Sequence, residues 1–483
     1  MKLRGSDLAL SLVVLALLAI PVSAGNEVPA SWGELEPGPY EVGFQAFHEE
    51  DRTRGYWPLR DYLGRERSGT TYRPMQVSVW YPAIEAVDAE PLRYGDYVEL
   101  QEMALGESHR EELRSALHAE LRDDFFGRFF QPDGPADVEI EAILDQPMAA
   151  RRDAPPRPGP FPVVIHSGFG PLAQSVLLEH LASHGYVVLT VPMLGSDAAW
   201  FNRGSGTLEW WLEVSRDIAW LRAFASRLPM ADVRRTAVIG MTGSAGMLDQ
   251  MSSMQLSAIV GTEAVWRDVL TEAPAFEPAR ARIPILDITS KGRSNRDLLD
   301  RLVFADRWIV RLDEVEHPDF YQFRRLTGPD AAVDHTGYTT TARLTRRFLD
   351  AHLKGVESEW SETSLRSASS EPLTTTHLPA EAPIPSEREF LLLVREGKSN
   401  EAAKAYRAAV STGHSRFFDP AALRTTAIFR LYDDDDAEGA AAALRILVDA
   451  YPGDVDGYRF LARALLALGD RSAARETLER ASA

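Results

Sequence analysis

Short apolar runs alternate with amphipathic segments through the middle of the chain. The amphipathic segments carry apolar residues at helical spacing, whereas the runs are short, apolar and bounded by glycine or proline. We therefore expect strands at 162–167, 186–191, 236–241, 257–262, 283–289 and 307–312, with helices between them. This alternation predicts an α/β fold with a mainly parallel sheet and helices on both faces. In such sheets the ligand site lies beyond the carboxyl ends of the strands.

The flanking segments extend this domain to residues 26–356. Residues 26–91 hold the first predicted strands, and residues 92–150 are rich in helix formers. We interpret 92–150 as a helical insertion that either covers the substrate side or only packs against the domain. Residues 357–385 lose the periodic pattern and fill with Ser, Thr, Glu and Pro, which is typical of a linker.

Residues 386–483 have a different pattern, made of alanine-rich amphipathic helices. Tyr458–Ala474 resembles a tetratricopeptide repeat, with Leu461, Ala462 and Gly469 at the expected apolar and small positions. Two weaker units precede it, and roughly three such units are needed for a stable stack. These repeats imply a protein partner.

The first residues predict export. A basic start, a short apolar run from Leu8 to Ile20 and small residues up to Ala24 form a secretory signal over 1–24, cleaved before Gly25. The alternative is an uncleaved anchor, although the run is shorter than the ~18 residues of a spanning helix. No later segment has the composition of a membrane span. We expect a secreted or periplasmic protein.

Composition narrows the function classes. The net charge is −19, which opposes nucleic-acid binding, and the absence of cysteine excludes thiolate chemistry. His180 and His184 are four residues apart but have no third ligand nearby, and the consecutive Asp433–Asp436 does not match a calcium loop. We expect neither a metal nor a cofactor.

The segment Gly240-Met-Thr-Gly-Ser-Ala-Gly246 carries the candidate chemistry. It follows a predicted strand and is close to the Gly-x-Ser-x-Gly elbow that holds the nucleophile of α/β hydrolases. The nucleophile slot falls on Thr242 when counted from Gly240, whereas Ser244 is the serine that keeps a following x-Gly. A β-branched residue fits the strained elbow poorly. We therefore prefer Ser244 and keep Thr242 as the alternative.

An acid and a base follow the candidate nucleophile in the order typical of α/β hydrolases. Glu263 comes after one apolar run, and His317 lies in a loop after a later one. Asp287 is the competing acid, although it lies within a predicted strand. Upstream, the strand 162–167 runs into a glycine turn whose amides could hold an oxyanion. His166, at the end of that strand, is expected to be buried and bonded to the backbone.

These motifs resemble the plasma-type platelet-activating-factor acetylhydrolases and their dienelactone-hydrolase-like bacterial relatives. The resemblance begins at Gly38–Gly43 and Arg73–Pro82 and ends at His317–Phe320. It implies an α/β-hydrolase fold. The family's Ser-His-Gly-x-Gly turn is similar to His166-Ser-Gly-Phe-Gly170, which places an oxyanion-hole amide on Phe169.

The same resemblance assigns the remaining roles. The family's acid, in a pattern similar to Asp-Ala-Trp, lands on Glu263, and its His-x-x-Phe pattern lands on His317. The family's Gly-His-Ser-x-Gly-Gly aligns with Gly240–Ala245, which puts Thr242 on the serine and Ser244 on a glycine.

Two functions follow. The first is a carboxylic-ester hydrolase for a small acyl ester or a lipid-like substrate, in which Ser244 attacks, His317 takes its proton and Glu263 orients the imidazole. The amides of Phe169 and Ala245 then form the oxyanion hole, with Gly243 in place of Ala245 if Thr242 is the nucleophile. The alternative is a pseudohydrolase that acts as a scaffold through its repeats.

Overall fold

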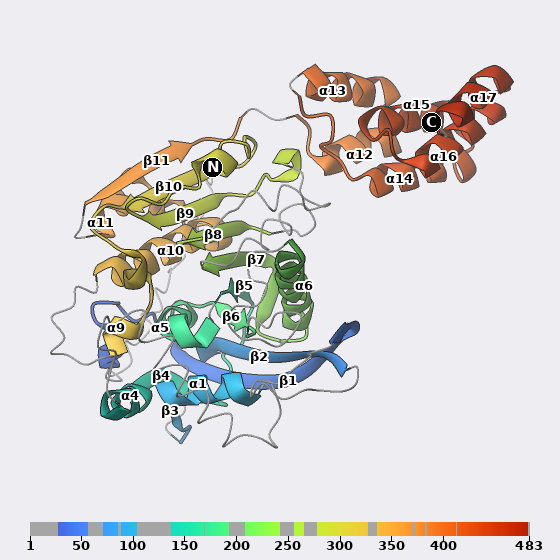
Figure 1. Cartoon of the computed structure of the whole chain (residues 1–483). Coiled ribbons are helices and arrows are strands. Elements are labelled where there is room, and N and C mark those ends of the chain that lie inside the picture. Colours follow the sequence, from blue (N-terminus) through green and yellow to red (C-terminus); the bar gives the residue numbers. More distant parts are fainter. Residues whose placement is uncertain are drawn as a thin grey trace, which may run out of the picture.

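The computed structural model of the chain contains a large sheet domain followed by a lobe of helices (Figure 1). It describes residues 28–56, 71–85, 88–103, 137–168, 170–192, 208–241, 256–264, 278–326, 336–369, 372–381, 384–411 and 413–481. The predicted signal segment 1–24 lies outside these ranges. Within them, no helix is both long and apolar enough to cross a membrane.

One eleven-stranded sheet forms the centre of the large domain, in the order β11-β10-β9-β8-β7-β5-β6-β2-β1-β4-β3. The strands are β1 (Glu41–Tyr56), β2 (Thr71–Ala83), β3 (Pro91–Arg93), β4 (Pro147–Arg152), β5 (Phe161–Ser167), β6 (Val187–Thr190), β7 (Ala231–Met241), β8 (Ala258–Thr262), β9 (Ile285–Ser290), β10 (Arg307–Leu312) and β11 (Leu373–Leu378). The six strands from β6 to β10 in this order pair in parallel, and β2 pairs antiparallel with both β1 and β6. The run from β1 to β10 has the strand order of the α/β-hydrolase fold, as predicted.

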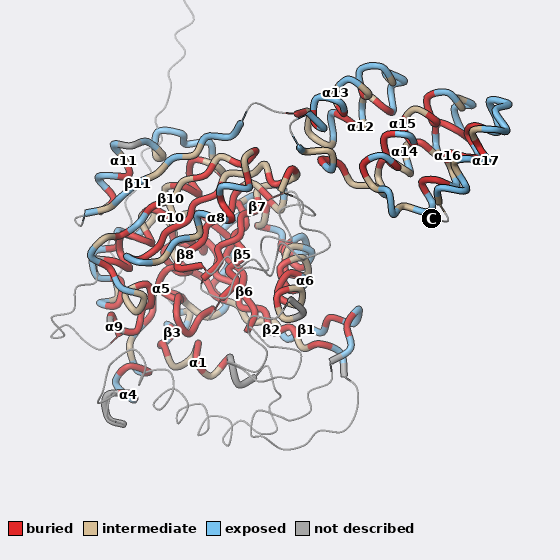
Figure 2. Tube along the Cα trace, turned by 45° about the horizontal axis from the view of Figure 1, so that its top comes forward, coloured by how far each residue is buried: buried red, intermediate tan, exposed pale blue. Residues whose placement is uncertain are grey.

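Helices cover both faces of this sheet. Ala237, Ile239 and Met241 of β7 pack into one apolar cluster with α5 (Gly170–Ser183) and α10 (Thr336–Lys354). Val238, between them in sequence, faces the opposite cluster with α6 (Leu208–Ala225). Successive side chains of a strand point to opposite faces, so a strand buried on both faces reads as a continuous apolar run. Figure 2 shows the buried residues gathered along β5–β8.

Two expectations about the flanking segments need correction. The insertion at 92–150 is not wholly helical, because α1 (Tyr94–Met103) and α4 (Asp137–Leu144) are accompanied by β3 and β4 at one edge of the sheet. The predicted linker 357–385 contains η7 (Glu357–Glu359), α11 (Glu362–Ser367) and β11. β11 pairs antiparallel with β10 along its whole length, so the sheet domain extends to Leu378.

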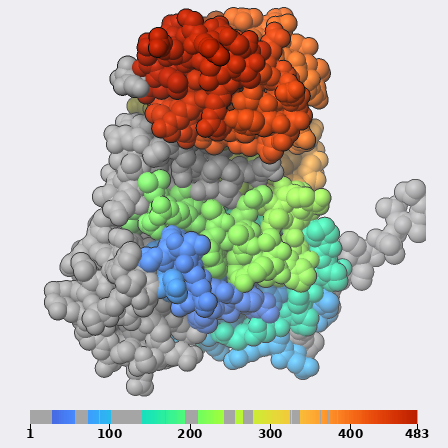
Figure 3. Space-filling model, turned by 90° about the vertical axis from the view of Figure 1, so that its right-hand side faces the viewer, coloured from blue at the N-terminus to red at the C-terminus, as the bar shows by residue number. Residues whose placement is uncertain are grey.

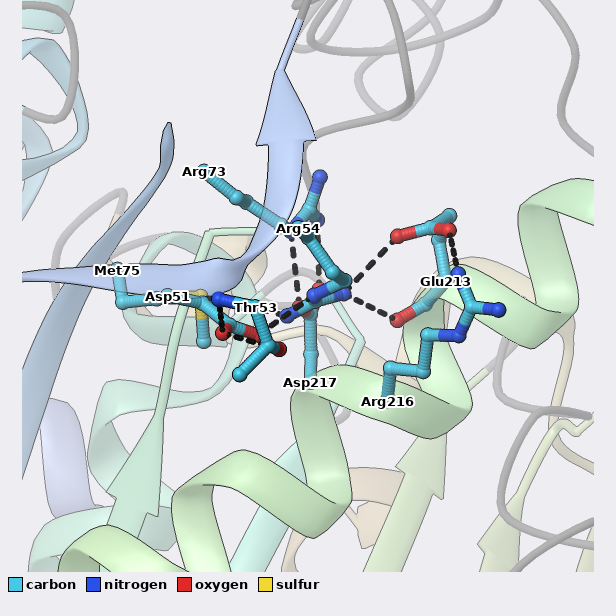
Figure 4. A network of polar contacts seen from close by, with 8 residues as sticks. All are labelled: Asp51, Thr53, Arg54, Arg73, Met75, Glu213, Arg216 and Asp217. Atoms are coloured by element: carbon cyan, nitrogen blue, oxygen red, sulfur yellow. Dashed lines mark hydrogen bonds and ion pairs between the residues drawn. The ribbon is translucent and has the colours of Figure 1, made fainter. Parts of the chain in front are cut away.

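A buried ionic network fastens the β1–β2 hairpin to α6 (Figure 4). Asp217 of α6 accepts hydrogen bonds from Arg54 Nη2 at 2.7 Å and from Arg73 Nη2 at 2.6 Å. Arg54 also pairs with Asp51 at 2.6 Å and with Glu213 at 2.9 Å. Because each charge has a partner, the network tolerates burial that isolated charges would not.

Six helices among the described residues form the C-terminal lobe, which Figure 3 shows in orange to red above the sheet domain. They are α12 (Glu387–Arg395), α13 (Ser399–Ser411), α14 (Pro420–Tyr432), α15 (Ala437–Ala450), α16 (Val455–Ala467) and α17 (Arg471–Arg480). Ala279 and Phe304 of the sheet domain join the apolar core of this lobe. Arg282 donates to the carbonyls of Ile384 and Pro385, both at 3.0 Å. The two parts are therefore in direct contact.

Candidate active site

The carboxyl ends of the parallel strands bring the predicted acid and base to one edge of the sheet. Met241, the last residue of β7, lies in register with Thr262 of β8. Glu263 is the next residue after β8, and His317 opens η6 (His317–Phe320), which follows β10. This is the edge at which α/β sheets place their ligand sites.

Glu263 and His317 are in direct contact. The Nδ1 atom of His317 lies 2.8 Å from Oε2 of Glu263. The Glu263 side chain is fully buried, whereas that of His317 is 34% exposed. A carboxylate at Nδ1 fixes the imidazole tautomer and leaves Nε2 as the unprotonated nitrogen. The pair therefore has the geometry of the acid and base of a catalytic triad.

Several groups hold the Glu263 carboxylate in place. The Ser290 amide donates to Oε1 at 2.5 Å, and Arg293 Nε lies 3.0 Å from Oε2. Burial alone would raise the pKa of Glu263, but the hydrogen bonds from His317 and Ser290 and the charge of Arg293 bring it below its usual value. Glu263 is consequently a carboxylate at neutral pH.

The backbone of Glu263 is strained, with φ at 50°. Non-glycine residues rarely adopt this left-handed conformation, which costs about 1–2 kcal/mol. The main chain is fixed on both sides, since its N–H donates to the carbonyl of Ile288 at 2.8 Å and its carbonyl accepts from Arg293 at 3.3 Å. The strained turn directs the side chain across the end of β9 toward His317.

Tyr321 contacts the other side of the imidazole. Its hydroxyl lies 3.1 Å from Nε2 of His317, and the two rings meet edge to face at 5.2 Å. With Nδ1–H donated to Glu263, Nε2 accepts this hydrogen bond. A nucleophile that delivers a proton to Nε2 must take the place of the phenol.

Asp287, the alternative acid, has a different partner. It is fully buried in β9, and both of its oxygens lie 3.1 Å from Nδ2 of Asn295. Burial, with a smaller contribution from the charge of Glu263, raises the pKa of Asp287 to about 7. The structure therefore brings Glu263 rather than Asp287 into contact with the histidine.

The glycine turn after β5 begins at the same edge. Ser167 of β5 lies in register with Gly240 of β7. Gly168 has φ at 153°, and a Cβ there would approach Met241 Cβ to 3.1 Å. His166 is buried as expected, but neither ring nitrogen is hydrogen-bonded within the described part of the chain. Burial lowers the pKa of His166 to about 4, so the ring is neutral.

The remaining predicted site residues lie outside the described residues. They are Phe169, Thr242, Gly243, Ser244 and Ala245. The strands that lead to them, β5 and β7, end at Ser167 and Met241, and Met241 lies in register with Thr262, the residue before Glu263.

Sequence reasoning missed Arg293, the Ser290 amide and Tyr321. Arg293 and Ser290 flank the end of β9, and their role depends on how the chain turns after that strand. Tyr321 is four residues after His317, a spacing that carries no motif of its own. Among the described residues, no group of three or more His, Asp or Glu side chains is arranged to hold a metal ion.

Comparisons with known proteins give a distant structural likeness. No protein-family model and no curated protein matches the chain. Among solved structures, it is similar to a ferulic acid esterase from Streptomyces cinnamoneus, with a TM-score of 0.47 and 17% sequence identity. That likeness covers 70% of this chain and 96% of the esterase chain.

Proposed function

We propose that the sheet domain is a serine hydrolase that cleaves carboxylic esters. The observation that carries this proposal is the buried, ionised Glu263 bound to Nδ1 of His317, directly beside the end of β7. The chain continues from β7 into the glycine-rich segment that contains Ser244. Nucleophilic catalysis requires a tautomer-locked histidine beside its nucleophile, and the Glu263–His317 pair supports the first half of this arrangement.

In the proposed reaction, Oγ of Ser244 attacks the acyl carbon while its proton passes to Nε2 of His317. Glu263 stabilises the imidazolium, and the amides of Phe169 and Ala245 hold the oxyanion. The alkoxide leaves with the proton from Nε2, and the acyl group stays on Ser244. A water molecule then attacks the acyl-enzyme, again giving its proton to Nε2, which returns that proton to Ser244 as the acid is released.

Turnover of p-nitrophenyl acetate by single variants tests the nucleophile. We expect Ser244→Ala to abolish turnover and Thr242→Ala to retain much of it. The reverse pattern would assign the role to Thr242, with the Gly243 amide in the oxyanion hole. Labelling with a fluorophosphonate probe followed by peptide mapping identifies the modified residue directly.

The Tyr321 hydroxyl at Nε2 favours a second candidate, a pseudohydrolase in which the imidazole no longer meets a nucleophile. An unmutated protein that neither turns over the ester nor reacts with the probe would support it. The double variant Thr242→Ser and Ser244→Gly restores the family's elbow. It then distinguishes a site that has lost only its nucleophile from a site that has decayed as a whole. Recovered activity requires that Glu263 and His317 are still correctly placed.

We also propose that the chain is exported and that residues 386–483 are tetratricopeptide-type repeats that bind a protein partner. The basic and apolar start and the paired helices α12–α17 support these two points. N-terminal sequencing of the mature protein tests the first, since a chain that still begins at Met1 would contradict cleavage. Affinity capture with residues 386–483, compared with the full chain, tests the second.

A further inference from the structure

A cationic cavity lies between α5 and α10, and we call it the α5–α10 cavity. It has a volume of about 200 Å³. Arg343, Arg346 and Arg347 of α10 line it, together with His180 and His184 at the end of α5. Positions i, i+3 and i+4 share one face of a helix, so the three guanidinium groups converge on the same space.

This cavity is separate from the candidate active site. α5 begins next to the carboxyl end of β5, and its 14 residues carry the chain roughly 20 Å toward the opposite edge of the sheet. His184 lies just beyond that helix, before β6 begins. The segment around Glu36 forms another wall, where its carbonyl contacts Nε2 of His184 at 3.1 Å.

The carboxylates around the cavity are shared among the cations. Asp350 binds both Arg346 and Lys354, the latter at 2.6 Å. Glu359 lies 3.5 Å from Arg346 and 3.9 Å from Arg347. The hydrogen bond of Arg343 goes to the main-chain carbonyl of Glu34. Among the residues that line the cavity itself, three are arginines and one, Glu36, is a carboxylate.

Two buried polar atoms at the cavity have no hydrogen-bond partner in the described part of the chain. They are Nε of Arg347 and Nδ1 of His180. The distance of 3.9 Å from Arg347 Nε to Glu359 is too long for a hydrogen bond. Native proteins satisfy nearly all buried polar groups, with water or ions where the protein supplies no partner. Both residues line the cavity.

The histidines add hydrogen-bonding capacity without adding charge. Burial, with the charge of Arg346, lowers the pKa of His184 to about 4. Burial, with the neighbouring His184, places the pKa of His180 well below its usual value. The positive charge of the cavity therefore comes from the arginines, whose forked donors match the oxygens of a tetrahedral oxyanion.

We propose that the α5–α10 cavity binds a phosphate group, supplied either by a free phosphate or by the headgroup of a phosphomonoester lipid. The volume accommodates one such group, and the excess of guanidinium over carboxylate selects an anion. The guanidinium groups of Arg343 and Arg347 supply the donors to it. The site is independent of the proposed hydrolase reaction, so failure of one leaves the other intact.

Titration of the full-length protein with inorganic phosphate, at ionic strength held constant with sodium chloride, tests the site. We expect saturable heat in calorimetry and a saturable rise in melting temperature. Arg343→Gln should weaken affinity at least about tenfold, since it removes one charge-assisted hydrogen bond. Arg347→Lys keeps the charge but loses the forked donors, and should weaken the affinity similarly.

Two further variants distinguish a specific loss of phosphate binding from a loss of the folded state. Arg459→Gln, on α16, removes an exposed helical arginine with its own 3.0 Å ion pair and should bind phosphate as the unmutated protein does. Ser367→Glu places a carboxylate on the cavity rim, where the Ser367 hydroxyl now accepts a hydrogen bond from Nη1 of Arg347 at 2.9 Å. We expect it to raise the melting temperature without phosphate and to abolish phosphate binding.

Vesicle co-sedimentation distinguishes the two sources of the phosphate group, a lipid headgroup and a free phosphate. Binding to phosphatidic acid vesicles but not to phosphatidylcholine vesicles, reversed by inorganic phosphate and lost in Arg343→Gln, identifies a lipid headgroup. Binding of inorganic phosphate without binding to vesicles identifies a free anion. Heats that never saturate, or equal affinities for the unmutated protein and Arg343→Gln, would overturn the proposal.

Discussion

Replacing Glu263 with glutamine tests how the candidate site is held together. Both oxygens of the carboxylate accept: Oε1 from the Ser290 amide, and Oε2 from Nδ1 of His317 and Nε of Arg293. A glutamine side chain has the same shape but offers one accepting oxygen and one NH₂ group. In either orientation the NH₂ group faces a donor.

The cost to stability follows from the burial of this side chain, which is fully inaccessible to solvent. Breaking a buried ion pair by removing one partner costs about 3–5 kcal/mol. Because the pKa of Glu263 is lowered in the folded state, its stabilisation is present above the ordinary value of 4.5 and is lost as pH falls through the folded pKa. At pH 4 the cost of Glu263→Gln should be smaller than at pH 7.5, since most unfolded chains already bind the proton.

Urea unfolding followed by tryptophan fluorescence measures this cost for the sheet domain alone. All 10 tryptophans of the chain lie between Trp32 and Trp360, outside the helical lobe. On the proposed function, kcat for p-nitrophenyl acetate should also fall by about three to four orders of magnitude, the scale for losing the acid of a Ser-His-acid triad.

Two results would contradict this reasoning. A destabilisation below about 0.5 kcal/mol at pH 7.5, the range of ordinary surface substitutions, would mean that the carboxylate is not held as described. A cost that stays the same or grows at pH 4 would mean that the pKa of Glu263 is not lowered by folding. A loss of kcat without any loss of stability would separate the catalytic role from the structural one.

Three other substitutions have directions fixed by the structure. Because burial raises the pKa of Asp287 to about 7, the contribution of this group to the free energy of unfolding is present at pH 4 and is lost as pH rises to 8. The difference in free energy of unfolding between Asp287→Asn and the unmutated protein should therefore shift in favour of the variant by on the order of 3–4 kcal/mol over that range; equal pH profiles in urea unfolding would refute this. Asp217→Asn breaks the buried network of the β1–β2 hairpin and should lower the free energy of unfolding by about 3 kcal/mol, whereas a change below 1 kcal/mol would show that the network is dispensable. Arg282→Ala removes the two hydrogen bonds to the connection before α12. A broad-specificity protease should then cleave within 379–386 about tenfold faster than in the unmutated protein. First cuts inside the sheet domain would contradict the proposed domain boundary.

The central strands were predictable because they are buried on both faces. β5 and β8, which are almost wholly buried, each differ from their predicted ranges by one residue. β11 was missed because an edge strand buries little of its surface, and Leu373–Leu378 is mainly threonine with an exposed or half-buried pattern. Composition alone cannot separate such a strand from a linker.

The site was predictable only in part, for a related reason. Glu263 and His317 follow strands that the sequence identifies, and parallel strands bring such residues to one edge. Arg293 and Tyr321 depend on the turns after β9 and β10, whose course is set by tertiary contacts. The nucleophile stays a prediction, with Ser244 preferred to Thr242.

The Glu263–His317 pair differs from an ordinary stabilising ion pair in three respects. Its carboxylate is held by a left-handed backbone that costs about 1–2 kcal/mol, which a stabilising contact alone would not require. The Glu263 carboxylate is fully buried, although the partly exposed Arg293 already neutralises its charge. It also contacts Nδ1 rather than Nε2, so the imidazole keeps its basic nitrogen available, and Tyr321 now donates to that nitrogen. Strain at functional sites persists where the surrounding structure enforces it, and here the enforced result is an imidazole with a fixed tautomer.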